Sequence, residues 1–351
     1  MKRVAFAVPG DLDTPTGGYA YDKRIITELR ALGWQVDVID LGATFPNPDT
    51  NARAAALAKL DAVTEGQPIV LDGLAFGVMT EEAVALSARY PLVALVHHPL
   101  ALETGLDRNM ARALHASERA ALACTQAVIV TSASTAEILR RDFAVPAARI
   151  TVIRPAVDRP QSRQKPPRAD GSVHLLAVGA ITPRKGYDML IEVLGSLQEL
   201  PWRLVIAGDI TRNAAASARL RAGIARQNLQ DRIAVTGAVS DAGLAEFYGQ
   251  ADVFVMTSQF EGYGMVLGEA VAYGLPVVAT TVGAAQEIVP ADAGVLVTPG
   301  DASALREALR RVIADANERA RLARGACDAS KRLPKWPDSA VQFAKVLEAL
   351  R

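Results

Sequence analysis

Two glutamates with a helical segment between them carry the clearest chemical potential in the chain. Glu261 and Glu269 are separated by seven residues in the stretch TSQFEGYGMVLGEAVAYGLPVVAT. Glu261 precedes an amphipathic segment from Met265 to Tyr273, and Glu269 lies about one turn inside it, so both carboxylates can face one crevice. There, one carboxylate can accept hydrogen bonds from sugar hydroxyls and the other from a ribose diol. The spacing alone also fits a solvated turn glutamate followed by an ordinary surface-helix glutamate.

The backbone between these glutamates suits a phosphate group. At the start of a helix here, the amides of Gly264, Met265 and Val266 would present free N–H groups and the positive end of the helix dipole. Gly262 and Gly264 leave room for close backbone approach by a ligand. We therefore expect this turn to be part of a binding site.

A strand–loop–helix–strand unit positions these groups. A strand-like run, Asp252–Met256, precedes the turn, and a second one, Pro276–Ala279, follows the helix. Gly274 and Pro276 end the helix, as a C-cap glycine and a following proline do. Open α/β sheets bind ligands outside the carboxyl ends of their strands, where this turn would lie.

A second group of candidates lies in VGAITPRKGYDML, where Arg184 and Lys185 come just before a predicted helix. Fixed positive charge there can neutralise the β-phosphate of a leaving nucleotide, and such charge stabilisation is a large catalytic effect. An exposed Arg-Lys pair is also common in a solvated turn. The loop PGDLDTPTGGYAYD has Gly17 and Gly18 shortly before a helix, where backbone amides could contact a diphosphate, although by itself the pair is better explained by a tight turn. The loop matches neither the G-x-G-x-x-G nor the P-loop pattern.

The histidines do not predict a metal site. His97 and His98 follow the strand LVALV, and adjacent strand residues point to opposite faces, which makes the two imidazoles poor joint ligands. The chain has four histidines, without metal-ligand spacing among them. We expect no metal ligands, and one histidine bonded to backbone in a strand-end turn is the structural alternative.

Strands alternate with helices along the chain, which predicts an α/β fold with parallel sheets covered on both faces. A proline-bearing segment of low apolar content, Arg154–Ser172, separates two such halves. Strands are expected at Arg3–Val8, Trp34–Asp40, Pro68–Asp72, Leu92–His97, Ala127–Thr131, Ile150–Ile153, Val173–Val178, Arg203–Ala207, Ile233–Thr236, Val253–Met256, Pro276–Ala279 and Val295–Val297. Helices are expected to about Leu32, at Ala52–Val63, Glu81–Arg89, Arg108–Cys124 and Thr135–Arg141, and after Pro337.

Composition narrows the class of protein. The 351 residues suit two domains, and 38 basic residues balance 38 acidic ones, which indicates no polyanionic partner such as nucleic acid. Two cysteines form no disulfide framework and favour a reducing, cytoplasmic location. The N-terminal MKRVAFAVPGD is better interpreted as a first strand than as a signal peptide, and no apolar stretch of ~18 residues predicts a membrane span.

The longer segment EGYGMVLGEAVAYGLPVVATTVGAAQEIV resembles the E-x7-E region of family 4 glycosyltransferases, which are retaining enzymes of the GT-B fold. Further similar pieces occur in order along nearly the whole chain. The resemblance implies two Rossmann-like, doubly wound parallel-sheet domains facing across a cleft. Residues 1–155, with a crossing C-terminal helix at 338–351, would form the acceptor-side domain, 156–172 a linker, and 173–337 the nucleotide-sugar domain.

The resemblance also implies roles for the residues. Lys185 and Arg184 would hold the diphosphate, and Glu269 the ribose. The sugar would be held by Glu261 and the amides of Gly262 to Met265, with His97 facing it and His98 as the substitute. The implied donor-binding set is Gly17, Gly18, Arg184, Lys185, Val239, Gly262, Tyr263, Gly264, Met265, Val266 and Glu269, with Ala238 and Val239 bordering the base through their backbone.

One position departs from the pattern of the family, and one segment matches a motif of other glycosyltransferases in form only. The family commonly has an arginine directly after the strand-end glycine, where this chain has Ala180, and whether Arg184 replaces that contact stays open. Asp11-Leu12-Asp13 has the D-x-D form that metal-dependent glycosyltransferases of another fold use. Because it lies in the half opposite the nucleotide, we interpret it as a chance match.

The implied activity is transfer of a hexose from a UDP- or GDP-linked sugar to a hydroxyl acceptor, a glycan, lipid-linked glycan or small polyol, with no cofactor and no metal. A nucleotide-sugar 2-epimerase or hydrolase of the same fold, or a non-catalytic binder, are the alternatives. The segment RNMARALHASERAALA, with Arg108, Arg112 and Arg119, is either a surface for peripheral contact with an anionic inner membrane or a charged solvent face.

Overall fold

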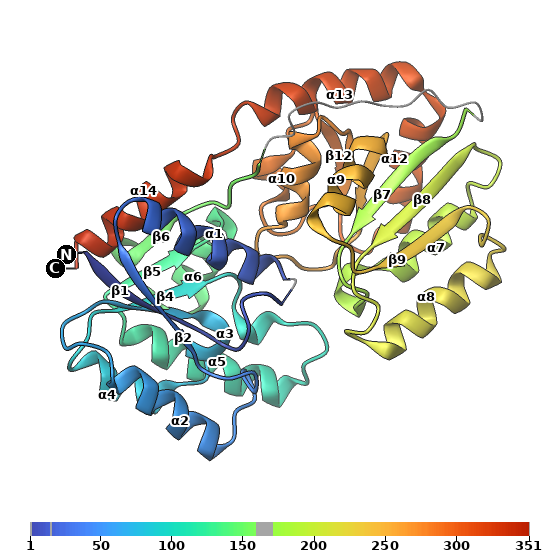
Figure 1. Cartoon of the computed structure of the whole chain (residues 1–351). Coiled ribbons are helices and arrows are strands. Elements are labelled where there is room, and N and C mark those ends of the chain that lie inside the picture. Colours follow the sequence, from blue (N-terminus) through green and yellow to red (C-terminus); the bar gives the residue numbers. More distant parts are fainter. Residues whose placement is uncertain (1, 15, 159–170, 351) are drawn as a thin grey trace. The chain divides into compact units, whose positions relative to one another are not determined.

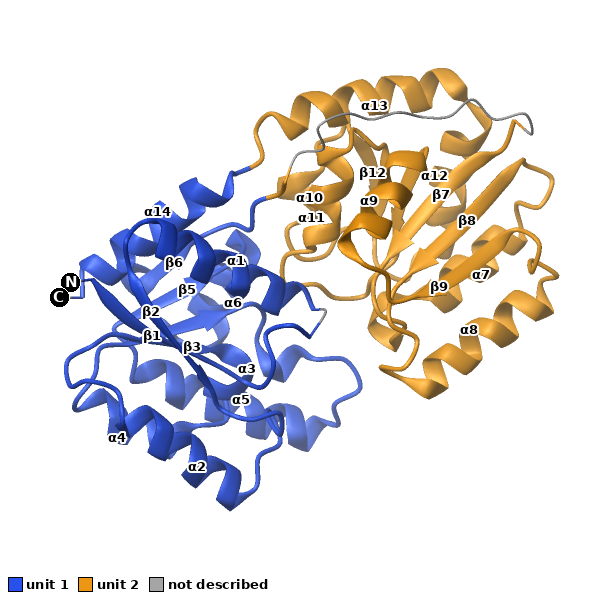
Figure 2. Cartoon of the chain, in the orientation of Figure 1, with its two compact units in different colours: residues 1–156, 334–351 blue, residues 157–333 orange. Residues whose placement is uncertain are grey.

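The computed structural model describes residues 2–14, 16–158 and 171–350, so most of the predicted linker at 156–172 lies outside the described residues. The chain divides into two compact units (Figure 2). Unit 1 consists of Met1–Ala156 and Pro334–Arg351, and unit 2 of Val157–Leu333.

Unit 1 is built on a six-stranded sheet in the order β2-β1-β3-β4-β5-β6, and all its neighbouring strands are parallel (Figure 1). Its central strands β3, β4 and β5 are buried along their whole length, as expected for a sheet covered by helices on both faces. The strands are β1 (Arg3–Val8), β2 (Gln35–Asp40), β3 (Ile69–Asp72), β4 (Leu92–Val96), β5 (Ala127–Val130) and β6 (Ile150–Val152). The helices are α1 (Gly17–Ala31), α2 (Thr50–Asp61), α3 (Gly73–Phe76), α4 (Thr80–Ser87), α5 (Arg108–Ala123), α6 (Ala133–Asp142) and α14 (Trp336–Glu348), with 3-10 turns η1 (Leu100–Leu102) and η2 (Ala147–Arg149).

Unit 2 has a second six-stranded parallel sheet, in the order β12-β11-β10-β7-β8-β9. The strands are β7 (Val173–Val178), β8 (Trp202–Ala207), β9 (Ile233–Gly237), β10 (Val253–Met256), β11 (Val277–Thr280) and β12 (Gly294–Val297). The helices are α7 (Tyr187–Gly195), α8 (Ala214–Arg226), α9 (Asp241–Gln250), α10 (Met265–Ala272), α11 (Ala285–Ile288), α12 (Ala302–Ala314) and α13 (Ala316–Ser330), with a 3-10 turn η3 (Pro183–Lys185). The α/β fold with parallel sheets is confirmed, and every predicted strand ends within one residue of its observed bounds.

Several helices start one or two residues before the expected position, and two of the differences have a clear physical reason. Helix α1 begins at Gly17, so Gly17 and Gly18 form its first turn and not a loop before it. The hydroxyl oxygen of Thr16 accepts a hydrogen bond from the Tyr19 amide, which caps the helix one residue before the glycines. The last helix begins at Trp336 and not after Pro337, because proline is tolerated in a first helical turn, where its missing N–H has no intrahelical partner to lose.

Helix α14 packs within unit 1. Phe343 is fully buried and its ring stacks on Phe6 of β1 with centroids 6.2 Å apart. The Ser339 hydroxyl donates to the Arg154 carbonyl at 2.9 Å. The last helix of the chain therefore completes the core that the first strand begins.

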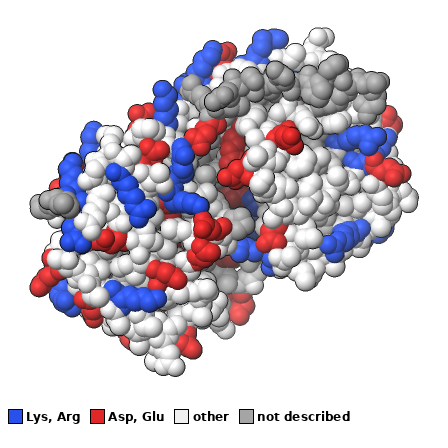
Figure 3. Space-filling model, viewed as in Figure 1, with Lys and Arg blue, Asp and Glu red and all other residues white. Residues whose placement is uncertain are grey.

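Charges of both signs are mixed on the face of the molecule that Figure 3 draws. This mixing is in keeping with equal numbers of basic and acidic residues in the chain. Among the helices of the described residues, none is long and apolar enough to cross a membrane.

Candidate functional site

The loop that carries Arg184 and Lys185 is fixed by a glycine. Gly186 ends η3 with φ +67°, and a Cβ there would lie 2.2 Å from the Thr257 carbonyl oxygen. The Thr257 hydroxyl donates to the carbonyl oxygens of Lys185 (3.0 Å) and Gly186 (3.1 Å). Only glycine satisfies both the backbone angle and this close approach, so the loop after β7 is held against the loop after β10.

This contact brings three predicted residues together around one carboxylate. The Nζ of Lys185 lies 2.6 Å from Glu261 Oε1, and Nη1 of Arg184 lies 3.0 Å from Oε2. The Ser258 hydroxyl, which the sequence reasoning missed, donates to Oε1 at 2.8 Å. Glu261 and Lys185 are 9% and 13% exposed at their side chains, so the pair is shielded from water.

The electrostatics of this cluster favour an anion. Burial would raise the pKa of Glu261, but the charges of Lys185 and Arg184, with hydrogen bonds from Lys185 and Ser258, lower it to about 2. The carboxylate is therefore ionised at neutral pH and balances one of the two cations. The three side chains together carry one net positive charge, which can attract a phosphate group.

Glu269 has a separate partner in unit 2. The Tyr248 hydroxyl of α9 donates to Glu269 Oε2 at 2.7 Å, and Tyr248 itself is buried and stacked on Tyr273 with ring centroids 5.1 Å apart. Burial raises the pKa of Glu269, and the hydrogen bond from Tyr248 opposes that rise. Sequence reasoning missed Tyr248, because an aromatic residue in an amphipathic helix is ordinarily core.

The turn before α10 leaves the start of this helix without a side-chain cap. Gly264 is the N-cap residue with φ +86°, and no side chain caps the helix. The first-turn amides, including those of Met265 and Val266, therefore lack the side-chain acceptor that most helices supply. Tyr263 is buried in the core beneath this turn, while Gly262 is partly exposed.

Three other residues of unit 2, Val239, Asp209 and Ala180, lie near strand ends. Val239 follows β9 and is 37% exposed. Asp209, after β8, accepts hydrogen bonds from the amide and hydroxyl of Thr211 at 2.7 and 2.6 Å, which is a local turn. Ala180 follows Gly179 at the end of β7, where the expected arginine is missing.

In unit 1, His97 lies directly after β4 and contacts α1. A Cβ on Gly18 would be 3.1 Å from His97 Cδ2, and His97 Nε2 is 3.0 Å from Asp22 Oδ1. Asp72, the last residue of β3, has Oδ2 3.7 Å from the same nitrogen. His98 lies elsewhere, with Nε2 3.1 Å from Glu103 Oε2. The structure therefore places His97, and not His98, against the predicted glycines.

Asp22 and Asp72 were missed by the sequence reasoning, although Asp22 lies one helical turn after Gly18 and Asp72 ends a buried strand. Within residues 2–14, 16–158 and 171–350, Asp22, Asp72 and His97 are the one group with ligand atoms spaced to hold a metal ion, all within 4.8 Å. The D-x-D segment is different: Asp13 pairs with Lys23, and Asp11 accepts the Asp13 amide at 2.8 Å.

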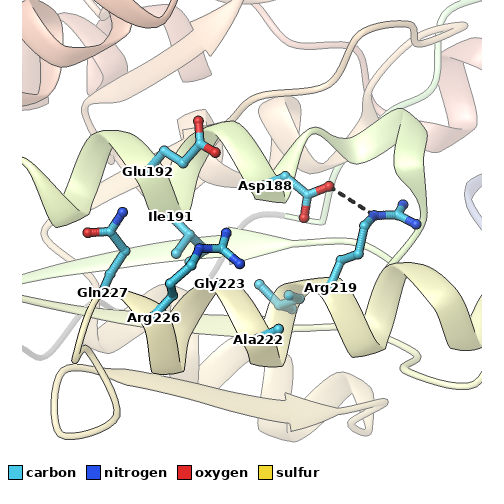
Figure 4. Close-up of a pocket in the computed structure, with 9 residues that line it drawn as sticks. Asp188, Ile191, Glu192, Arg219, Ala222, Gly223, Arg226 and Gln227 are labelled. Atoms are coloured by element: carbon cyan, nitrogen blue, oxygen red, sulfur yellow. Dashed lines mark hydrogen bonds and ion pairs between the residues drawn. The ribbon is translucent and has the colours of Figure 1, made fainter.

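Two surface features do not include the predicted site residues. A groove of about 250 Å³ lies between α7 and α8, where Asp188 and Arg219 form an ion pair of 3.3 Å (Figure 4). On α5, Glu118, Ala121 and Leu122 are buried, while Arg108, Arg112 and Arg119 are exposed. This arrangement fits a charged solvent face and leaves membrane contact untested.

Two family models match the chain. Residues 158–328 match the model described as Glycosyl transferases group 1, and residues 75–160 match that of Glycosyltransferase Family 4. The two matches together run through most of unit 2 and the second half of unit 1.

Curated relatives include a D-inositol 3-phosphate glycosyltransferase of Xylanimonas cellulosilytica, 33% identical over 244 residues, covering 65% of this chain and 58% of that protein. An MMP alpha-(1->4)-mannosyltransferase of Mycolicibacterium hassiacum is 27% identical over 322 residues, or 87% of this chain and 76% of that one. The chain thus spans less than two thirds of the length of the first of these relatives.

Solved structures share the fold over the whole chain. The sucrose-phosphate synthase of Thermosynechococcus elongatus matches with a TM-score of 0.83 and 23% identity, covering 100% of this chain and 99% of that one. Anabaena HepE, in complex with UDP and glucose, matches with a TM-score of 0.78 and 19% identity, covering 99% and 100%. The fold is GT-B, as the sequence predicted.

Proposed function

We propose that this chain, which belongs to the family 4 glycosyltransferases, transfers a sugar from a nucleotide-diphosphate sugar to a hydroxyl acceptor with retention of anomeric configuration. The observation that carries the proposal is the cluster of buried Glu261 with partly buried Lys185 and Arg184, whose one net positive charge lies in the loops that lead to the uncapped start of α10.

The two cations would stabilise the leaving group. When a donor binds, its diphosphate takes the place of Glu261 as the partner of Lys185 and Arg184, because a phosphate carries more negative charge and more acceptor oxygens than a carboxylate. Negative charge on the β-phosphate grows as the bond to the anomeric carbon breaks. Cations already fixed at that position stabilise this charge without reorganisation.

The carboxylates would hold hydroxyl groups. Once released from the cations, Glu261 can accept hydrogen bonds from the transferred sugar, with the amides of Gly262 to Met265 as donors nearby. Glu269 uses one oxygen for Tyr248, and a carboxylate has further lone pairs for a ribose diol. Val239 bordering the base, and Gly17, Gly18 and His97 contacting donor or acceptor, remain predictions from the family resemblance.

Retention would follow from substitution on one face of the sugar. The anomeric carbon–phosphate oxygen bond breaks, the acceptor oxygen bonds to the same carbon on the same face, and the acceptor proton passes to the leaving phosphate oxygen. Lys185 and Arg184 supply the positive charge that a metal ion supplies in other glycosyltransferases, so we propose a metal-independent reaction without a cofactor.

The acceptor is proposed only by class. The relatives are named for transfer involving inositol phosphate and mannose, and a small polyol or a glycan is the acceptor class that we propose here. Contact with a membrane surface through α5, and with it a lipid-linked acceptor, stays a prediction.

The test begins with ligand binding. A thermal-shift panel of UDP, GDP and ADP should give one nucleotide that raises the melting temperature well above the others. Sugars linked to that nucleotide are then offered with and without polyol and glycan acceptors, and the anomeric configuration of the product is determined by NMR.

Each outcome of this panel separates the proposal from its alternatives. A product with the donor's configuration supports the proposal, and an inverted product contradicts retention. Sugar release or epimerisation independent of any acceptor would identify a hydrolase or 2-epimerase. Tight nucleotide binding without turnover of any donor would identify a non-catalytic binder.

A further inference from the structure

One face of helix α1 packs against the His97 ring. Gly18, Tyr21 and Asp22 have the i, i+3 and i+4 spacing that places residues side by side on a helix. A Cβ on Gly18 would lie 3.1 Å from His97 Cδ2, and the Tyr21 ring meets the imidazole edge-on with centroids 5.5 Å apart. The ring is thus fixed by the packing of α1 before any polar contact is considered.

Asp22 supplies the polar contact between this face of α1 and His97. Its side chain is fully buried, and Oδ1 lies 3.0 Å from His97 Nε2, within hydrogen-bond range. The second oxygen, Oδ2, is also buried and has no hydrogen-bond partner among the residues that the structure describes. A buried carboxylate with so few partners is costly unless a neighbouring group stabilises its charge or shares a proton with it.

Asp72 is a second buried carboxyl group close to Asp22. Its Oδ1 accepts the Leu74 amide at 2.7 Å and caps α3, while Oδ2 lies 3.7 Å from His97 Nε2, too far for a hydrogen bond. Burial raises the pKa of Asp22 and of Asp72 to about 7 each, and for Asp72 the nearby charge of Asp22 raises it further. The two carboxyl groups therefore share a proton near neutral pH, and one negative charge remains beneath the imidazole.

We infer that Asp22 is a positioning residue that holds His97 as the tautomer protonated on Nε2, which leaves Nδ1 as a hydrogen-bond acceptor for a ligand hydroxyl. This inference deepens the proposed function and rests on it for the identity of the ligand, a hydroxyl of the sugar or its acceptor. With the shared proton on Asp72, Asp22 is ionised and can only accept, so the proton of the 3.0 Å contact belongs to Nε2, and the other nitrogen of a neutral imidazole is then an acceptor. Buried aspartates orient catalytic histidines in hydrolases by the same logic.

The tautomer is measurable on the intact, unliganded protein. Long-range ¹H–¹⁵N NMR distinguishes the two ring nitrogens, and with four histidines in the chain the His97 signals are assigned by comparison with a His97→Gln variant. We expect wild-type His97 to show a single tautomer with Nε2 protonated at pH 7.5. Asp22→Ala should give a mixture of both tautomers, because no acceptor fixes the proton.

A conservative variant and a matched control exclude a general packing effect. Asp22→Asn, which keeps the size of the side chain, should also lose the single tautomer, because a carboxamide can donate through its nitrogen as well as accept through its oxygen. Thermal melting confirms that both variants fold. Glu103→Ala removes the carboxylate partner of the adjacent His98 and should leave the His97 signals unchanged.

Four results would overturn the inference. The first three are a wild-type His97 protonated on Nδ1, a mixture already present in the wild type, and an Asp22→Ala spectrum identical to the wild type. A fourth is loss of the His97 signals on adding one equivalent of Zn²⁺ or Mn²⁺ in the wild type but not in Asp22→Ala, which would identify a metal site instead. These measurements need no sugar. If the protein were inactive on every donor, the proposed function would be contradicted, but the tautomer of His97 could still be determined.

Discussion

At the residue scale, Glu261 occupies the position relative to Lys185 and Arg184 that we propose for the donor's diphosphate. The carboxylate pairs with two partly buried cations, and we propose that a stronger anion replaces it, which would make Glu261 available to sugar hydroxyls. One side chain would then stabilise the unliganded cluster and take part in the liganded one.

Lys185→Ala should lower kcat/KM by at least about 10²-fold, the effect of removing one group that stabilises charge in a transition state. Lys331→Ala is the matched control, because Lys331 is an exposed lysine of unit 2 that pairs with Asp328. Steady-state rates with the donor identified by the nucleotide panel provide the measurement. Equal kcat/KM for Lys185→Ala and wild type would remove Lys185 from the site.

The stability that Glu261 contributes should depend on pH. Its pKa is lowered from 4.5 to about 2 in the folded protein, so its contribution, on the order of 3 kcal/mol, is complete well above pH 4.5 and is lost as pH falls toward 2. The difference in unfolding free energy between wild type and Glu261→Gln should therefore be constant from pH 8 to 6 and shrink below about 4.5. Urea unfolding across this range measures it. A difference that grows on acidification would contradict the assigned direction of the pKa shift.

At the element scale, glycines at loop ends decide how the site loops meet. Gly186 allows the loop after β7 to contact the loop after β10, and Gly283 allows the loop after β11 to approach Glu261, whose carbonyl oxygen a Cβ would meet at 2.8 Å. These contacts join three strand ends into one surface of unit 2.

Gly186→Ala should destabilise unit 2 by more than its backbone angle alone requires. Alanine at a positive φ costs about 1–2 kcal/mol, and displacing the Thr257 carbonyl, 2.2 Å from the new Cβ, adds about 1–3 kcal/mol more. Gly300→Ala is the control, since Gly300 has φ +82° but nothing within 4 Å of an added Cβ. Comparable losses for the two variants on denaturant unfolding would show that the close approach contributes nothing.

At the scale of the whole molecule, unit 1 is assembled from both ends of the chain. Helix α14 buries Phe343 and Leu347 against the core that begins with β1, so the segment that follows unit 2 in sequence stabilises unit 1. The stability of unit 1 can therefore be changed by mutations in α14, which unit 2 separates in sequence from the rest of unit 1.

Phe343→Ala should cost about 3–5 kcal/mol, the range for removing a buried phenylalanine ring, and the loss should fall on unit 1. Hydrogen exchange is expected to accelerate in β1 and α1 while β10 and β11 keep wild-type protection. Val341→Ala, on the same helix but 40% exposed, should leave both units unchanged. Equal acceleration in both units would contradict the division of the chain.

The sequence by itself determined the secondary structure and the type of fold. Buried runs such as Val277–Thr280, which follows Gly274 and Pro276, predict strands because apolar runs and turn chemistry are local properties. The same local logic marked Arg184, Lys185, Glu261 and Glu269, which lie at a strand end or helix start. It misplaced the start of α1, where the Thr16 cap outweighs the glycines.

Only the tertiary structure decided which of these side chains meet. Lys185 reaches Glu261 across 76 residues, His97 reaches Asp22 across 75, and Tyr248 reaches Glu269 across 21. A periodic pattern reports which face of an element is buried, but the residue that faces it from another element depends on strand order and register. Asp22, Asp72, Tyr248 and Ser258 therefore emerged from the packing alone.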